Sequence, residues 1–267
     1  KRWHHGDPVR YQPFSAQLQG SLVAKPNYSF EKRQRDLAKK AKQEEKRQQK
    51  LANKAEWLAE EVQKATREIR DREEELIHRL SKAAEYRAPE TGSHIKRMSW
   101  YSRHIAAQLG FSVTEQDLIL EAAPMHDIGK VGIPDAILLK PDKLTDTEFH
   151  FMKEHSKIGY EILNGSSSRL MQIGAQIALS HHEKYDGTGY PYGLKGEEIS
   201  IYGRIIAVAD VFDALTSSRP YKQAWPIENA VAFLKENSGK HFDPACIAAF
   251  FNNWESILAI RQRFNED

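Results

Sequence analysis

The sequence predicts an all-α protein in which a long coiled-coil helix precedes a helical bundle. Residues 31–87 contain neither Gly nor Pro and carry a heptad of apolar residues, which is typical of a long helix. From residue 88 onward, shorter amphipathic segments are separated by Gly and Pro, which indicates several short helices. Strand signals are few, and the sequence has no Gly-rich phosphate loop of the P-loop or dinucleotide type.

The composition is that of a globular protein with an excess of charge, because 40% of the 267 residues are hydrophobic and 28% are charged. A net charge of only +2 gives no reason to expect nucleic acid or a membrane surface as partner. The single cysteine, Cys246, excludes a disulfide framework and a Cys-based zinc site. No apolar run reaches the roughly 18 residues that span a bilayer and no signal peptide is evident, so we expect a cytoplasmic protein with no membrane segment.

Residues 1–30 have no sustained periodicity, and Pro8, Pro13 and Pro26 interrupt them. We expect a poorly specified segment or the remnant of an upstream sensor domain. Because the chain begins at Lys1 rather than Met, we expect it to be a piece of a longer protein.

Residues 31–87 are predicted to form a coiled-coil linker and dimerisation helix. Its apolar residues recur in steps of three, four and seven, and they are Leu51, Ala55, Leu58, Val62, Ala65, Ile69 and Leu76. Such a polar helix needs a partner, so we expect a parallel homodimer that buries this stripe; a single solvated helix packed on the bundle is the alternative. Basic residues predominate between positions 32 and 54, but such a run is more often a solvated face than a nucleic-acid contact.

Two segments of the bundle carry clear helical signals. Thr145 and Glu148 form a capping box, and Phe149, Met152 and Ile158 are expected on one helical stripe after it. A second helix is predicted over residues 200–215, with Ile201, Ile205, Val208, Ala209 and Phe212 facing the core.

Histidine and aspartate residues recur at nearly regular intervals of 32, 28, 26 and 28 residues. They are His94, His126, Asp127, His155, His181, His182 and Asp210. Two antiparallel helices with their loops take about this much chain, so each interval can return the next residue to the same end of a bundle. A mixture of imidazole and carboxylate ligands suits iron, manganese or zinc, and so many ligands predict more than one ion.

Any one of these histidines could instead be an ordinary buried or surface residue. The adjacent pairs favour a metal site, because two consecutive polar side chains in an apolar helical neighbourhood are costly unless something binds them. Pro124 predicts a bend in the chain just before the first pair.

Three segments resemble the HD-GYP phosphodiesterases, a group of the HD metal-dependent phosphohydrolases that hydrolyse cyclic di-GMP in bacterial second-messenger signalling. They are His126-Asp127-Ile-Gly-Lys130-Val-Gly-Ile-Pro134, His181-His182-Glu-Lys-Tyr-Asp-Gly-Thr-Gly189-Tyr190-Pro191 and Ala209-Asp210-Val-Phe-Asp213-Ala-Leu. The resemblance extends from about Tyr86 to the C terminus and implies an HD-type helical bundle, with residues 88–267 as the HD-GYP catalytic domain. Residues 83–98 also resemble the join of a response-regulator linker to such a domain, so we expect an upstream sensor or receiver domain that regulates the site.

The resemblance implies that the seven regularly spaced residues are metal ligands. It adds Glu90, four positions before His94 and therefore on the same helix face, as a ligand that supports a third ion. We therefore expect two or three divalent ions, with iron or manganese favoured. Lys130, Arg219 and Lys222 match the basic residues that contact phosphate in this family, and the two phosphodiester anions of cyclic di-GMP require such cations.

Other residues of these motifs are expected to support the site. The segment from Gly187 to Pro191 is predicted to line the substrate cleft, with Tyr190 near a phosphate or base, and a tight turn is compatible with the same residues. Asp213, three positions after Asp210, is expected to orient a ligand or to pack rather than to bind metal.

The resemblance implies metal-assisted hydrolysis of cyclic di-GMP to linear pGpG, and to GMP after a second cleavage. Asp127, as a bridging ligand, and Lys130, which stabilises charge on the phosphate oxygens, are the expected catalytic residues. One alternative is a catalytically weak sensor or scaffold for cyclic dinucleotides, although no ligand is missing. Another is a di-iron oxygenase of the HD fold, which the basic residues and the Gly-Tyr-Pro loop disfavour.

Overall fold

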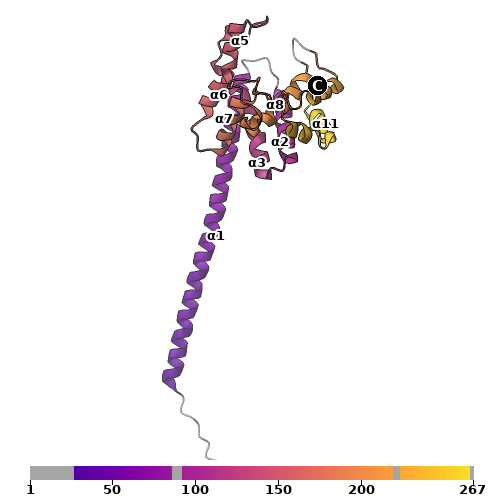
Figure 1. Cartoon of the computed structure of the whole chain (residues 1–267). Helices are drawn as coiled ribbons and strands as arrows, with labels where there is room; N and C mark the ends of the chain where they lie inside the picture. The colour runs from indigo at the N-terminus through magenta and orange to yellow at the C-terminus, as the bar shows by residue number, and fades with distance from the viewer. Residues whose placement is uncertain (1–26, 86–91, 219–222, 265–267) are drawn as a thin grey trace, which may run out of the picture. The chain divides into compact units, whose positions relative to one another are not determined.

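The computed structural model describes residues 27–85, 92–218 and 223–264, and Figure 1 shows its helices. The elements are α1 (Tyr28–Glu85), α2 (Gly92–Gln108), α3 (Val113–Ala122), η1 (Ala123–Gly132), α4 (Asp135–Leu138), α5 (Asp146–Lys153), α6 (His155–Leu163), α7 (Arg169–Ser180), η2 (Gly196–Glu198), α8 (Ile201–Thr216), α9 (Ile227–Glu236), α10 (Pro244–Phe251) and α11 (Trp254–Arg263). The described residues contain no strand beyond an isolated bridge between Ser238 and Phe242. The predicted all-α class is confirmed, and none of the described helices is both long and apolar enough to cross a membrane.

The chain forms two compact units, residues 1–65 and residues 66–267. The described part of the first unit is the N-terminal portion of α1, and all its residues are exposed. The predicted long helix is therefore confirmed, whereas its pairing with a second copy stays a prediction. Residues 1–26, which make up most of the predicted N-terminal segment, lie outside the described residues.

The core of the second unit holds α8 in place. Tyr101 of α2, Phe212 of α8 and Phe250 of α10 are fully buried, and their rings meet edge to face with centroids 4.9 to 6.0 Å apart. Burying each such ring stabilises the fold by about 2 to 3 kcal/mol, and each aromatic pair adds roughly 1 kcal/mol. The helix predicted over residues 200–215 is confirmed as α8, which carries Asp210 and Asp213.

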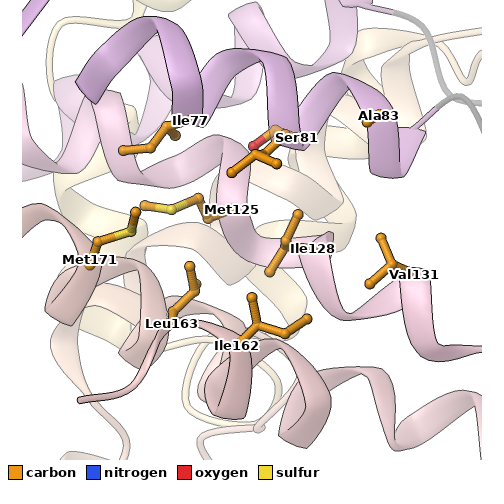
Figure 2. Close-up of a pocket in the computed structure, with 10 residues that line it drawn as sticks. Ile77, Ser81, Ala83, Met125, Ile128, Val131, Ile162, Leu163 and Met171 are labelled. Atoms are coloured by element: carbon orange, nitrogen blue, oxygen red, sulfur yellow. The ribbon is translucent and has the colours of Figure 1, made fainter. Parts of the chain in front are cut away.

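The last turns of α1 belong to the second unit and pack on the bundle. Ile77, Ser81 and Ala84 are buried there, whereas Leu80 on the adjoining face is exposed. A mainly apolar cavity of about 210 Å³ lies between these turns and the elements η1, α6 and α7. Figure 2 shows Ile77 and Ser81 on one side of it and Met125, Ile128, Leu163 and Met171 around it. Arg70 of α1 also forms an ion pair with Glu121 of α3 at 3.2 Å.

Element η1 follows α3 directly and is a 3-10 helix with Pro124 in its first turn, so the regular α-helix ends before His126, whereas the predicted bend stays a prediction. Its Gly129 lies against the backbone of α6, because a Cβ atom there would overlap the His155 carbonyl oxygen and the Gly159 amide. Gly159 in turn lies close to Ala178 of α7. These small residues let three backbones approach one another closely, which brings the ligand residues of all three elements together.

The predicted capping box is confirmed, because the Thr145 hydroxyl accepts from the Glu148 amide and the Glu148 carboxylate accepts from the Thr145 amide. The single helical stripe predicted after it is wrong. The chain bends at Glu154, so Phe149 and Met152 lie on α5 whereas Ile158 lies on α6. Phe149 is 45% exposed and no residue of α5 is buried.

We expect Gly129→Ala to destabilise the protein by about 3 kcal/mol or more, because the added methyl group overlaps backbone atoms that cannot move alone. Gly132→Ala is the matched control on the same element, since its Cβ would meet only the flexible Ile158 side chain. We expect that variant to lose about 1 kcal/mol or less. Urea unfolding of both variants measures the difference, and equal losses would show that η1 does not need this close approach.

Candidate metal centre

The seven predicted ligands lie in two neighbouring groups of donor atoms. Within each group one donor atom of every residue lies within 4.8 Å of the others. The first group is Asp127, His155, His181 and His182, and the second is His94, His126 and Asp210. The other residues predicted to act here, Glu90, Arg219 and Lys222, lie outside the described residues.

The ends of several helices bring these donors together. His94 lies in the first turn of α2, His126 and Asp127 lie in η1, and His155 is the first residue of α6. His181 is the C-cap residue of α7, His182 follows it, and Asp210 lies within α8. His94, His126, His155 and His181 are all buried. The regularly spaced residues therefore come together inside the bundle, as the sequence predicts, and most of them lie at or near the end of a helix.

Hydrogen bonds to backbone carbonyls fix the orientation of three imidazoles. Nδ1 of His126 lies 3.1 Å from the Ala123 oxygen, and Nδ1 of His155 lies 2.7 Å from the Met152 oxygen. Nδ1 of His181 lies 3.1 Å from the carbonyl oxygen one turn earlier in α7. Because a carbonyl oxygen only accepts, Nδ1 carries the proton in each ring. The lone pair is then on Nε2, the nitrogen available to a ligand.

Burial favours the neutral form of His155, His181 and His182. It lowers the pKa of His181 to about 3, and nearby His126 adds to the effect. Burial also lowers the pKa of His155 and, together with His181, holds that of His182 well below its ordinary value. The His181 and His182 ring centroids are 3.9 Å apart, so two charged rings would repel each other strongly. Neutral imidazole is the form that binds a metal ion.

Asp127 lies between the two groups. Its Oδ2 is 3.1 Å from His126 Nε2, whereas its Oδ1 is 3.3 Å from His155 Nε2 and 3.8 Å from His181 Nε2. Burial alone would raise the pKa of Asp127, but the Lys130 ammonium, 2.6 Å from Oδ2, holds it well below its usual range. Asp127 is therefore ionised and presents one oxygen to each group.

The donor set fits divalent cations. Neutral His155 and His181 direct Nε2 lone pairs at a carboxylate oxygen, and two acceptors at this distance repel each other unless a cation lies between them. Among the described residues, His181 Nε2 has no hydrogen-bond partner although it is buried. The absence of thiolate suits iron, manganese or zinc rather than softer ions.

The chain has the sequence pattern of a known family, because the HD domain family model matches residues 34–246. The chain belongs to the HD domain family. The predicted HD-type bundle and HD-GYP resemblance are confirmed. The chain is 50% identical over 198 residues to the "Cyclic di-GMP phosphodiesterase response regulator RpfG" of Xanthomonas campestris pv. campestris (strain 8004), which covers 74% of this chain and 52% of that protein.

A second relative of this HD domain protein is the "3'3'-cGAMP-specific phosphodiesterase 2" of Vibrio cholerae serotype O1, 45% identical over 194 residues, which are 73% of this chain and 37% of the relative. The chain thus spans about half, or less, of the length of these curated relatives. The crystal structure of the cyclic GMP-AMP phosphodiesterase V-cGAP3 of V. cholerae aligns with a TM-score of 0.51 and 23% identity over 72% of this chain and 52% of that one. That likeness shows a shared fold.

The Gly-Tyr-Pro loop of this HD domain is held beside the donors by Glu183, a buried residue that the sequence reasoning did not single out. The Glu183 carboxylate accepts hydrogen bonds from the Tyr192 amide at 2.8 Å and the Leu194 amide at 3.1 Å. The Tyr190 ring lies 4.7 Å from the His182 ring, centroid to centroid. Burial raises the pKa of the Tyr190 hydroxyl, so it remains protonated and able to donate a hydrogen bond.

An aromatic and cationic rim beside Tyr190 was also missed. The ring centroids of Phe149 and Tyr190 are 6.3 Å apart, and Lys153 Nζ lies 4.8 Å from the first centroid and 5.4 Å from the second. The sequence signal for this rim is that Phe149 lies between the polar residues Glu148 and His150, whereas its spacing predicts that it lies on a helical stripe. The rim offers ring faces and a positive charge at the edge of the HD donor groups.

We expect the free energy of unfolding of the metal-free HD domain protein to decrease as the pH falls from 6.5 toward 4. In this window the unfolded chain takes up protons at His155, His181 and His182 that the folded protein does not bind, because the folded pKa values lie below 6.5. His181 alone contributes a slope of about 1.4 kcal/mol per pH unit below that value.

Urea unfolding of chelator-treated protein at several pH values measures this slope. His181→Asn should show a shallower dependence, since one of the groups that link proton uptake to unfolding is gone. A wild-type slope no steeper than that of the variant would show that His181 is not held neutral in the folded state.

Proposed function

We propose that this HD domain protein hydrolyses cyclic di-GMP to linear pGpG, with GMP as the product of a second cleavage. The observation that carries the proposal is the pair of neighbouring donor groups, with Asp127 of the first group in contact with His126 of the second and Lys130 beside it. The name of the Xanthomonas relative, a cyclic di-GMP phosphodiesterase, supports the same reaction. Because that relative is about twice as long as the matched region, the activity of the whole protein is part of the proposal.

In this proposal two divalent ions, iron or manganese, are held by the two donor groups, and Glu90 is the ligand for a third. Bound there, such ions act as Lewis acids, lower the pKa of a water molecule and neutralise charge on the phosphate. The protein supplies seven donors, and hydrogen bonds orient four of the imidazoles among them. Little reorganisation is then needed at binding, which favours affinity.

Asp127 and Lys130 act together at the centre of the site. Asp127 serves both donor groups, so its carboxylate is the proposed bridging ligand. Lys130 lies one turn later on η1, and its Nζ donates a hydrogen bond to Oδ2 of Asp127 at 2.6 Å. When substrate binds, this cation is placed to stabilise the charge that develops on a non-bridging phosphate oxygen. A fixed charge in a site with little water stabilises that oxygen more than a mobile one does.

The remaining substrate contacts are proposed for Tyr190, Arg219 and Lys222. Tyr190 keeps its hydroxyl proton and lies beside His182, where it can donate to a phosphate or contact a base. Arg219 and Lys222 would neutralise the second phosphate of the cyclic dinucleotide. Phe149 adds an exposed ring at the same edge.

Cyclic GMP-AMP is the second substrate to test, because the relative that is 45% identical carries that specificity in its name. The two dinucleotides share both phosphodiesters and differ in one base, so the metal centre cannot discriminate between them. A catalytically weak sensor is not favoured, since the donor set is complete and the relatives are named as enzymes.

We further propose that residues 31–87 form a parallel homodimeric coiled coil that connects an upstream sensor or receiver domain to the catalytic part, residues 88–267. The apolar stripe of α1 is exposed in the single chain, with Leu58 at 45% and Val62 at 63%. Burial of this stripe against a second copy would stabilise α1, which has no other apolar face in the first unit. A cytoplasmic location stays a prediction from the sequence.

The enzymatic proposal is tested by turnover of cyclic di-GMP and of cyclic GMP-AMP by anaerobically purified protein loaded with Fe(II) or Mn(II). We expect pGpG or GMP as products, complete loss of activity in Asp127→Asn, and a loss of about 10²- to 10³-fold in Lys130→Met. Lys157→Met is the matched control, because Lys157 forms an ion pair of the same spacing with Glu154 outside the donor groups. Ions bound without turnover of either dinucleotide would contradict the proposal.

The dimer is tested by light scattering of the wild type and of Leu58→Glu/Val62→Glu. We expect a dimer for the wild type and a monomer for the variant, because two buried like charges per copy oppose pairing. Gln63→Glu, which adds one charge outside the stripe, should remain dimeric. A wild-type monomer at all concentrations would refute the coiled coil.

A further inference from the structure

Asp213 is a carboxylate in the core of the bundle that belongs to neither donor group. It is 0% exposed and lies on α8, one turn after Asp210. Its Oδ2 accepts from His94 Nδ1 at 2.9 Å, and both of its oxygens accept from Arg97, through Nε at 2.6 Å and Nη2 at 3.0 Å. A buried carboxylate is tolerated when hydrogen bonds and an opposite charge satisfy it in this way.

His94 depends on this carboxylate for its orientation. Whereas His126, His155 and His181 donate to carbonyl oxygens three or four residues earlier in the chain, His94 donates to a side chain 119 residues away. Because the carboxylate accepts at Nδ1, His94 presents Nε2 to the second donor group, where it lies 3.5 Å from Asp210 Oδ1. Asp213 bonds to His94, Arg97 and Ser217, and none of these residues belongs to the first donor group.

Arg97 fixes Asp213 in turn. It lies one turn after His94 on α2 and is buried. Its Nη2 also donates to the Ser217 hydroxyl at 2.8 Å, and its Nη1 donates to the Phe264 carbonyl at 2.9 Å. One guanidinium therefore joins α2, the end of α8 and the residue that follows α11. The planar fork of Arg suits such simultaneous bonds, and Lys could not replace all of them.

We propose that Asp213 and Arg97 are positioning residues that hold His94 ready for one ion, the ion of the second donor group. The pair acts through His94 and leaves the first group, Asp127, His155, His181 and His182, untouched. This inference rests on the proposed function, since it assumes that both donor groups bind metal.

The proposal predicts a selective loss of one ion. Metal-free wild type and variants are titrated with Mn(II), and bound metal per chain is counted by elemental analysis after gel filtration. We expect two or more ions in the wild type. In Asp213→Asn we expect one ion to bind as before and the affinity for another to fall by about 10- to 100-fold. Electron paramagnetic resonance should change from the signal of a coupled Mn(II) pair to that of isolated Mn(II).

Two further variants keep the test decisive. Arg97→Lys retains a buried cation, so it should fold even if Asp213→Asn does not, and it should weaken the same ion by a smaller factor. Asp117→Asn is the matched control, because it breaks another Arg–Asp pair of α2, with Arg103, away from the donors. We expect the control to bind as many ions as the wild type.

The outcomes separate this inference from the proposed function. A wild type that binds fewer than two ions overturns both. A wild type with two ions, together with Asp213→Asn and Arg97→Lys variants that bind two ions at unchanged affinity, overturns the positioning role alone. Equal loss of both ions in the variants would also overturn it, because the effect would then be general unfolding of the site rather than orientation of His94.

Discussion

The arrangement of this bundle depends on keeping several imidazoles and carboxylates close together where water is scarce. Like-charged imidazoles at these separations repel each other, and a carboxylate facing neutral nitrogen lone pairs gains no hydrogen bond from them. The described geometry and burial favour neutral His155 and His181 rings that donate their Nδ1 protons to carbonyl oxygens, beside an ionised Asp127. The apolar core therefore has to hold together imidazole and carboxylate groups that repel one another when no cation is bound.

The surrounding helices provide that support through backbone packing and through the aromatic core. Gly129 and Gly159 let η1 and α6 approach to backbone contact, so Asp127 and His155 lie at ion-pair distance although 28 residues separate them. On the other side, the rings of Tyr101, Phe212 and Phe250 fix α8 and with it Asp210. Apolar burial on both sides of the donor groups thus compensates for the repulsion among them. Such compensation is common where a functional site is destabilising by itself.

Much of this arrangement could be predicted from the sequence because it follows from helical periodicity and chain length. The all-α class, the helix that carries Asp210 and the convergence of the seven ligands all follow from such local rules. The break between α5 and α6 was missed, because the spacing of Phe149 and Ile158 fits a continuous helix as well as two helices. Arg97 and Glu183 were missed for another reason: each satisfies a group that only the folded chain brings near it. Spacing along the chain does not encode such pairs.

The contact between the end of α1 and the bundle sets a limit on the movements of that helix. Its buried face presents Ile77, Ser81 and Ala84 to an apolar wall, whereas His78 and Lys82 lie exposed next to them. A rotation by one residue position, about 100°, would turn the side chain of His78 or Lys82 toward Met125 and Ile128 of η1. At intermediate rotation angles, neither the apolar nor the polar side chains of α1 would fill the cavity. The packing therefore favours one orientation of the end of α1, and a rotation of this helix would disturb the packing of η1, which carries His126 and Asp127.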